Sequence, residues 1–179
     1  MQTWPTRPNR ATSQTTTPLH RSKPGRTING IITSNDLVGA YTHFWKGRTS
    51  LCTYPECEPC SVSRSARWYG YLHIWNPETN ASGILEITPS CLPAIDDWLE
   101  KFGTLRGAKI SVSRASHKIN SRVVATLKAT NFAIDRIPPC VDVISQLCRM
   151  WEVTREAAAT ADDDAQGVRA KLKELRAVG

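Results

Sequence analysis

The sequence of 179 residues contains no long hydrophobic run. No segment approaches the roughly 18–20 apolar residues that a membrane-spanning helix needs, and the polar N-terminus lacks the apolar stretch of a secretory signal peptide. We therefore expect a soluble, cytoplasmic protein without membrane partners. In a reducing compartment, clustered cysteines indicate metal binding more often than disulfides.

Sequence features of common enzymes are also missing. There is no glycine-rich phosphate-binding loop of either common type. Asp96 and Asp97 face different sides of a predicted helix, and Asp162–Asp164 lie in a predicted tail, so the carboxylates are not grouped for catalysis. The His/Cys-x-Glu element and second Cys-x2-Cys pair of a zinc deaminase are absent. We therefore predict that the protein is not an enzyme.

Acidic residues are absent from the first 30 positions, which carry five Lys and Arg residues. Residues 61–137 carry ten basic and six acidic residues, whereas residues 138–179 carry six and seven. The excess behind the formal net charge of +7 therefore lies in the N-terminal segment and the expected core. Such a surplus favours an anionic partner, for example nucleic acid.

Composition divides the chain into three parts. Residues 1–27 are rich in Thr, Pro, Arg, Ser and Asn and almost free of apolar side chains, so we expect a disordered basic arm. Residues 28–137 hold the β-forming segments and the cysteine cluster, and we expect them to form the nucleic-acid-binding domain. Residues 138–179 are predicted as a helical extension or tail. Its apolar stripe consists of Val141, Ile144, Leu147, Cys148 and Trp151.

Five segments have the composition or alternation of β-strands. They are Leu37–Trp45, Trp68–Trp75, Gly83–Ile87, Ala108–Ser113 and Ser121–Lys128. A helix is predicted between the third and fourth, with Thr88 as its N-cap, Pro89 at its first position and Gly103 at its end. This connectivity is that of an OB-fold, a small Greek-key barrel. We therefore predict a mainly β, OB-fold-like five-stranded barrel with a metal-binding loop between its first two strands.

The strongest chemical signal is the pattern His-x8-Cys-x4-Cys-x2-Cys, formed by His43, Cys52, Cys57 and Cys60. Zinc prefers tetrahedral sites of thiolate and imidazole, and a Cys-x2-Cys step lets two sulfurs from one tight turn bind the same ion. Three thiolates and one imidazole saturate the ion and leave no position for a substrate water. The pattern therefore predicts a structural Zn²⁺ site.

Alternatives to this ligand set remain open at this point. Two of the clustered cysteines could form a disulfide and leave one thiol free. An iron–sulfur cluster would need a fourth soft ligand, such as Cys91. Within a zinc site, His73 or Cys91 could replace His43, because a lone histidine beside aromatic residues is often merely packed or exposed.

The order of these ligands, in the early loop of an expected OB barrel, resembles one family. Over residues 37–128, the ligand order and the string of strands are similar to those of the T-even phage single-stranded-DNA-binding, or helix-destabilising, proteins. The resemblance implies a zinc-containing OB-fold with a positively charged cleft for the strand. It also implies replication or recombination proteins as partners, and a location at the nucleoid or in a phage-infected cell.

Binding of single strands needs cations along the backbone path and aromatic faces for the bases. Basic side chains around the metal loop, and on the last two predicted strands with their connection, are candidate phosphate contacts. They are Lys46, Arg48, Arg64, Arg67, Lys109, Arg114, Lys118, Arg122 and Lys128. Each of them could instead be an ordinary solvated charge.

The predicted strand Trp68–Trp75 offers an aromatic face made of Tyr69, Tyr71, His73 and Trp75. We predict that Tyr69 and Tyr71 stack on bases, although these side chains could instead cover the metal loop or the end of the barrel. The sequence thus predicts a protein that binds single-stranded DNA or RNA. The competing class is a zinc-ribbon protein–protein adaptor in a replication or phage assembly complex, in which the metal loop and the aromatic strand dock a partner.

Overall fold

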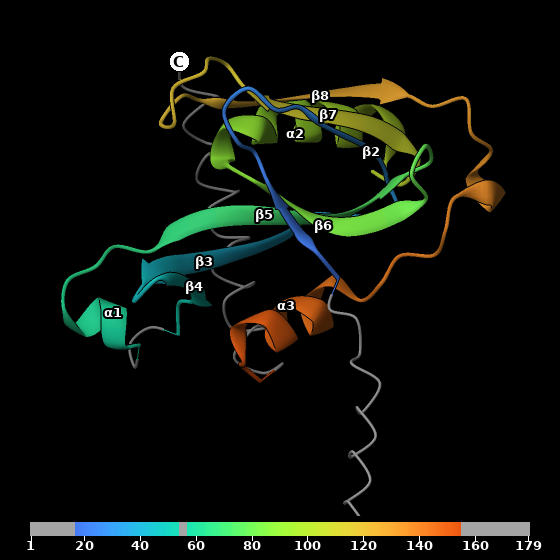
Figure 1. The fold of residues 1–179 in the computed structure, drawn as a ribbon. Coiled ribbons are helices and arrows are strands. Elements are labelled where there is room, and N and C mark those ends of the chain that lie inside the picture. Colours follow the sequence, from blue (N-terminus) through green and yellow to red (C-terminus); the bar gives the residue numbers. More distant parts are fainter. Residues whose placement is uncertain (1–16, 54–56, 155–179) are drawn as a thin grey trace, which may run out of the picture.

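A computed structural model describes residues 17–53 and 57–154 (Figure 1). In this part of the chain the fold is mainly β, with eight strands in one sheet. The strands are β1 (Leu19–Arg21), β2 (Ile28–Ile32), β3 (Val38–Trp45), β4 (Arg48–Leu51), β5 (Arg67–Asn76), β6 (Ala81–Ile87), β7 (Ala108–Arg114) and β8 (Val123–Ala129). The helices are α1 (Glu58–Ser61), α2 (Leu92–Phe102) and α3 (Val143–Trp151), with short 3-10 helices η1 (Pro89–Cys91) and η2 (Ile134–Arg136).

The strands follow a Greek-key path. β5 pairs antiparallel with β2 on one side and with β6 on the other, and β7 returns after α2 to the free side of β2. The resulting order, β7-β2-β5-β6, is that of a Greek key. β8 extends the sheet beyond β7, and the β3–β4 hairpin joins it at the first half of β5.

The sheet is not closed into a barrel. Among the described strands β8 pairs with β7 alone, and the outer edge of β6 is taken by β1 in parallel pairing. The prediction of a mainly β fold with a helix before the last two strands is confirmed, but the sheet has eight strands instead of five. The strands that the sequence did not predict are β1, β2 and β4. They have three to five residues each and partly polar sequences, so they carry little of the alternating pattern that identifies a strand.

Apolar side chains cover both faces of β5. Trp68, Leu72 and Ile74 pack into the larger core, together with side chains of α2, β7 and β8. Tyr71 points to the opposite side, into a second cluster that includes Trp151 of α3. Figure 1 shows the layers that result: β7 and β8 at the top with α2 close beneath them, β5 and β6 in the middle, and α3 below.

The helix predicted after Thr88 is present. Its first turn is the 3-10 helix η1, which leads directly into α2. Gly103 ends α2 in the left-handed conformation (φ 70°), and its N–H donates to the carbonyl of Leu99 at 2.8 Å, as in a glycine C-cap. Ile95 is completely buried in the larger core, so α2 is held by its apolar face.

Residues 17–27, which composition assigns to a disordered arm, contain β1 and are ordered against the sheet. Arg21 adds an ion pair with Glu86 of β6 at 3.0 Å. Backbone hydrogen bonds to a sheet edge thus order a segment that has few apolar side chains of its own. Residues 1–16 of the predicted arm lie outside the described residues.

The predicted C-terminal extension begins as a helix, α3, that packs on the sheet. Asp142 caps it by accepting hydrogen bonds from the backbone N–H of Ser145 at 3.0 Å and from its hydroxyl at 2.8 Å. Residues 155–179 lie outside the described residues. None of the described helices combines the length and the apolar character that crossing a membrane requires.

Candidate metal centre and basic surface

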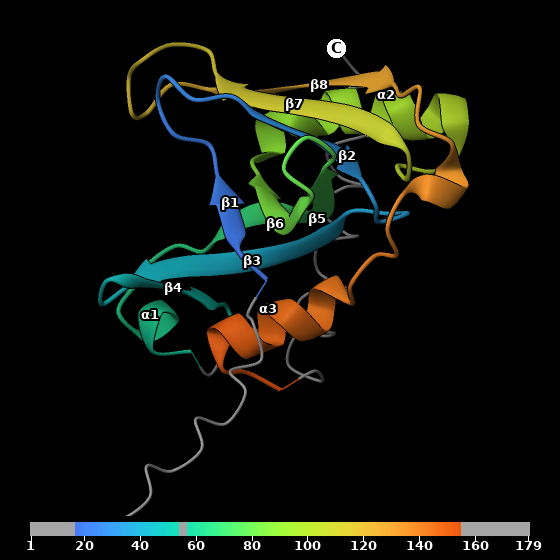
Figure 2. The same cartoon turned by 45° about the vertical axis from the view of Figure 1, so that its right-hand side comes forward.

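One compact segment, from β3 to α1, carries all four predicted metal ligands. They are His43 on β3, Cys52 directly after β4, Cys57 at the N-cap of α1, and Cys60 within α1. β3 and β4 are joined by Lys46 and Gly47, whose φ angles of 47° and 81° are those of the two-residue turn that matches the twist of a hairpin. Figure 2 shows α1 beside the end of this hairpin.

The ligand atoms of the four residues all lie within 4.8 Å of one another. Cys52 Sγ is 3.8 Å from Cys57 Sγ and 3.6 Å from Cys60 Sγ. His43 Nε2 is 3.6 Å from Cys57 Sγ and 3.4 Å from Cys60 Sγ. In a tetrahedral zinc site with ordinary bond lengths, two sulfurs lie about 3.8 Å apart, and a sulfur and a nitrogen about 3.6 Å apart. The cluster therefore has the size and the donor atoms to hold one metal ion.

The alternative ligand sets do not match this arrangement. No disulfide joins any two of the three clustered cysteines. Cys91 is buried in the larger core, where its Sγ lies 3.8 Å from the carbonyl oxygen of Val123. His73 is buried beside Thr33, whose hydroxyl forms a hydrogen bond with His73 Nδ1. Neither joins the cluster, and its fourth member is His43.

The three thiols influence one another's ionisation. Burial opposes ionisation of Cys57, but hydrogen bonds from Cys60, Cys52 and the backbone outweigh it and lower the pKa of Cys57. The hydrogen bond with Cys57, then burial and the neighbouring sulfur charges, raise the pKa of Cys60 to about 12. Ionisation of one thiol therefore disfavours ionisation of the next. All three can ionise together only where a cation offsets the repulsion between the thiolates. A metal ion held by the cluster would supply that charge.

The strand positions the imidazole of His43. His43 is 2% exposed and lies opposite Ser50 in the β3–β4 ladder. Its Nδ1 is buried and has no hydrogen-bond partner among the described residues. Metal-binding histidines usually donate this second N–H to an acceptor. Here, packing around β3 fixes the direction in which Nε2 points.

The basic residues predicted around the metal loop are partly engaged within the protein. Lys46 and Arg48 form ion pairs with carboxylates at 2.6 and 3.4 Å. The guanidinium of Arg64 lies 5.9 Å from the ring centroid of Trp45, and Arg67 is exposed at the start of β5. Exposed ion pairs of this kind are weak in water, so the side chains can exchange them for another anion.

The basic residues predicted between β7 and β8 differ in their roles. Arg114 donates to the carbonyl oxygens of Ser22 at 3.1 Å and Ser121 at 2.9 Å, which ties two loops together. Lys118 and Arg122 are exposed in the connection itself. Arg114 is thus a structural residue in this conformation, and its two neighbours are solvated.

The aromatic platform predicted on β5 is covered. Tyr71 is 0% exposed, and its hydroxyl donates to Glu86 at 3.3 Å. Its ring cannot offer a face to a base, so the stacking prediction does not hold for Tyr71; the apolar stripe of α3 takes that place. Tyr69 is half-buried at the edge of the same cluster.

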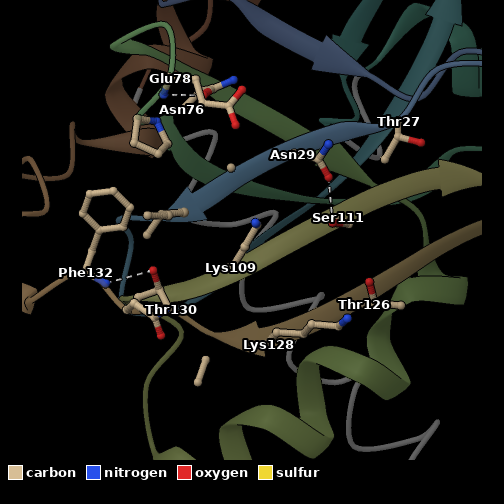
Figure 3. Close-up of a pocket in the computed structure, with 15 residues that line it drawn as sticks. Thr27, Asn29, Asn76, Glu78, Lys109, Ser111, Thr126, Lys128, Thr130 and Phe132 are labelled. Atoms are coloured by element: carbon tan, nitrogen blue, oxygen red, sulfur yellow. Dashed lines mark hydrogen bonds between the residues drawn. The ribbon is translucent and has the colours of Figure 1, made fainter.

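A polar hollow of about 640 Å³ lies over the outer face of β2, β7 and β8 (Figure 3). The predicted residues Lys109 and Lys128 line it. The sequence did not single out Asn29 or Phe132, which line it as well. For Phe132 the available signal was a lone aromatic residue in a polar stretch directly after a strand.

A second hollow of about 410 Å³ adjoins the first. Its lining includes the basic side chains of Arg21, Lys23 and Arg26. The two hollows share Thr27, Asn29 and Asn76, so they form one continuous surface, which we call the basic surface.

Comparison with known proteins gives no relative: no family model, no curated protein and no solved structure matches this chain.

Proposed function

We propose that this protein binds single-stranded nucleic acid through its basic surface, and that a structural zinc ion fixes the β3–β4 hairpin. The observation that carries the proposal is the charge of the two adjoining hollows. Among the described residues, five cations line them, against one carboxylate, Glu78: Arg21, Lys23, Arg26, Lys109 and Lys128. Arg21 is held by its ion pair with Glu86, outside the hollows, so Lys23, Arg26, Lys109 and Lys128 carry the proposal. Such a surface attracts a polyanion and releases its counterions.

The strand order supports this function. An OB-fold is a partly open Greek-key barrel with one helix before its last two strands, and it is a frequent carrier of single strands. We interpret β2 and β3 together as the first strand of such a barrel, opened between β6 and β8. On this interpretation α3 covers the outer face of β5 and β1 takes the edge of β6. These two strands correspond to those whose face usually binds in an OB-fold, so the proposed contact lies instead on β2, β7 and β8.

Zinc is the proposed metal because the donor set is three sulfurs and one imidazole nitrogen at tetrahedral spacing. Four protein ligands complete its coordination, so the ion would organise the hairpin without activating a water. Elemental analysis of the purified protein should find one zinc per chain.

The experiment that tests nucleic-acid binding is a fluorescence anisotropy titration of labelled oligo-dT, a mixed-sequence RNA and a DNA duplex over a series of salt concentrations. We expect the single strands to bind more tightly than the duplex, with an affinity that falls linearly on a log–log plot against salt. Absence of oligonucleotide binding at low salt would refute the proposal.

A role as a protein adaptor is favoured by one different observation. Phe44, on the metal-bearing hairpin, is 76% exposed, and exposed aromatic residues on rigid elements are frequent anchors of protein interfaces. Docking through Phe44 would persist at high salt, whereas binding through the basic surface would not. A Phe44→Ser variant that binds oligonucleotides like the wild type would separate the two surfaces.

A further inference from the structure

Two lysines occupy opposite positions on neighbouring strands and line the first hollow. Lys109 of β7 and Lys128 of β8 are directly opposite in the antiparallel ladder, and both are exposed. Like charges in this position repel and destabilise a sheet. In the part of the chain that the structure describes, neither lysine forms an ion pair. Among residues 17–53 and 57–154, the pair therefore has no anion of its own.

The surroundings of this pair are polar and almost free of negative charge. Glu78 is the one carboxylate among the residues that line the hollow, on the β5–β6 turn. Figure 3 shows Glu78 beside Asn76, whose side-chain oxygen accepts the backbone N–H of Glu78 at 2.9 Å. The hydroxyl of Ser111 on β7 donates to the side-chain oxygen of Asn29 on β2 at 2.7 Å. The hollow thus offers hydrogen-bonding groups around two lysines that no described carboxylate pairs with.

An aromatic ring stands at one end of the same hollow. Phe132 is 42% exposed, although large apolar side chains are usually buried. Its ring meets Trp75 edge to face with centroids 5.7 Å apart, and its backbone N–H donates to the hydroxyl of Thr130 at 3.2 Å. One side chain and one backbone contact therefore hold the ring in place while leaving much of it open to solvent.

We propose that Lys109 and Lys128 together bind one backbone phosphate and that Phe132 stacks on a neighbouring base, so that the hollow holds about one nucleotide of a single strand. This inference rests on the proposed function and specifies its site. A volume of about 640 Å³ lies within the range of about 300–1,000 Å³ typical of small-ligand sites. An exposed base is required for stacking, which a duplex does not offer.

The test compares the full-length wild type with Lys109→Gln/Lys128→Gln, with Phe132→Ala and with Lys101→Gln. Lys101 lies near the end of α2 and lines neither hollow, so its variant controls for the loss of charge alone. The double variant should lower the slope of log affinity against log salt by about 0.7, since the two lysines share one phosphate and each phosphate contact on a single strand contributes about 0.7. Phe132→Ala should weaken oligo-dT binding about tenfold, with an unchanged slope, because it removes stacking and no charge.

A second measurement uses inorganic phosphate as the probe. Raising phosphate at constant ionic strength should raise the melting temperature of the wild type and of Lys101→Gln, but not that of Lys109→Gln/Lys128→Gln. Equal shifts in all three proteins would overturn the phosphate site. This readout does not depend on oligonucleotide binding, so it judges the site even if the proposed function fails.

Two further outcomes would overturn the inference while leaving the proposed function in place. In the first outcome, Lys109→Gln/Lys128→Gln and Phe132→Ala both bind oligo-dT with the affinity and the salt slope of the wild type. The strand would then bind elsewhere on the protein. In the second outcome, an acidic polypeptide competes for the surface as well as a nucleic acid does. Polyglutamate should displace oligo-dT at least tenfold less well than unlabelled oligo-dT of equal charge, and equal competition would mean that the hollow recognises charge alone.

Discussion

The ring of Tyr71 on β5 meets the indole of Trp151 on α3 edge to face, with centroids 5.5 Å apart and planes at 74°. The two residues are among the largest buried side chains of the second apolar cluster, with exposures of 0% and 9%. This contact attaches the C-terminal helix to the middle strand of the sheet. α3 is therefore part of the folded domain and not an appendage to it.

Truncation of that contact should be costly. Trp151→Ala should lower the free energy of unfolding by about 3–5 kcal/mol, because it removes a buried indole and leaves a cavity. Chemical denaturation followed by circular dichroism measures the change. Arg149→Ala, at an exposed position on the same helix, is the matched control and should stay within about 0.5 kcal/mol of the wild type. A Trp151→Ala protein as stable as the control would show that α3 does not pack on β5.

Loss of one thiol ligand should release the metal. We expect Cys57→Ser to reduce the metal content from one ion per chain to a substoichiometric amount and to cost at least about 2 kcal/mol of unfolding free energy. Cys140→Ser is the control, because Cys140 is exposed and lies outside the cluster. Elemental analysis and thermal melts of the two variants decide the matter. Retention of both metal and stability in Cys57→Ser would remove this residue from the ligand set.

The buried histidine in the sheet should make stability depend on pH. Burial lowers the pKa of His73 below its ordinary value of 6.5, so the folded protein keeps this imidazole neutral where the unfolded chain binds a proton. Neutral His73 therefore contributes to the free energy of unfolding. This contribution is fully present above about pH 6.5 and is lost as the pH falls through the lowered pKa of the folded state. Between pH 8 and pH 5, the wild type should therefore lose more unfolding free energy than His73→Gln.

The same measurement contains its own control. Protonation of the metal ligands in acid affects the wild type and His73→Gln alike, so it cancels in the difference between them. Parallel stability curves for the two proteins would contradict a role for His73 in acid unfolding.

Neutralising one lysine of the cross-strand pair should stabilise the sheet. Lys128→Gln should raise the free energy of unfolding at low salt by about 0.2–1 kcal/mol, since it removes the repulsion from Lys109. The gain should shrink at 1 M salt, where the repulsion is screened. Lys101→Gln should show no such gain. A loss of stability in Lys128→Gln at low salt would mean that the two charges do not repel each other in the folded protein.

A side chain at position 83 should displace the first strand. A Cβ on Gly83 would collide with the imidazole of His20 and lie 2.9 Å from the carbonyl oxygen of Pro18. Gly83→Ala should therefore speed amide hydrogen exchange in β1 while leaving β5 and β7 protected. Ser82→Ala, one position earlier on β6, is the control. Unchanged exchange in β1 would show that it can shift aside without losing its pairing.

Several elements could be predicted from the sequence because their signals are local. The aromatic run from Trp68 to Trp75 lies within β5, and the glycine stop at Gly103 ends α2 as expected. The metal ligands lie so close in sequence that their spacing alone predicts their meeting. β1 and β4 could not be found in this way, because strands of three and four residues with polar side chains depend on the edges they pair with.

The position of α3 depends on contacts between residues far apart in the sequence. The sequence pattern predicts the aromatic face of Tyr71 as a platform for bases, although the opposite face, with Leu72 and Ile74, is apolar as well. A strand that is apolar on both faces is normally covered on both. That rule, combined with the apolar stripe that contains Leu147 and Trp151, would have indicated the helix as the cover. The hollow at Lys109 needed the register of β2, β7 and β8, which local patterns do not specify.

All four ligands of the metal centre lie between positions 43 and 60, on one hairpin and the short helix after it. During synthesis, this whole set has been made before β7, the strand that completes the Greek key, exists. A hairpin that binds the proposed ion could therefore load it while the remainder of the chain is still growing. An ion bound that early would join α1 to the hairpin before the finished sheet exists to hold them.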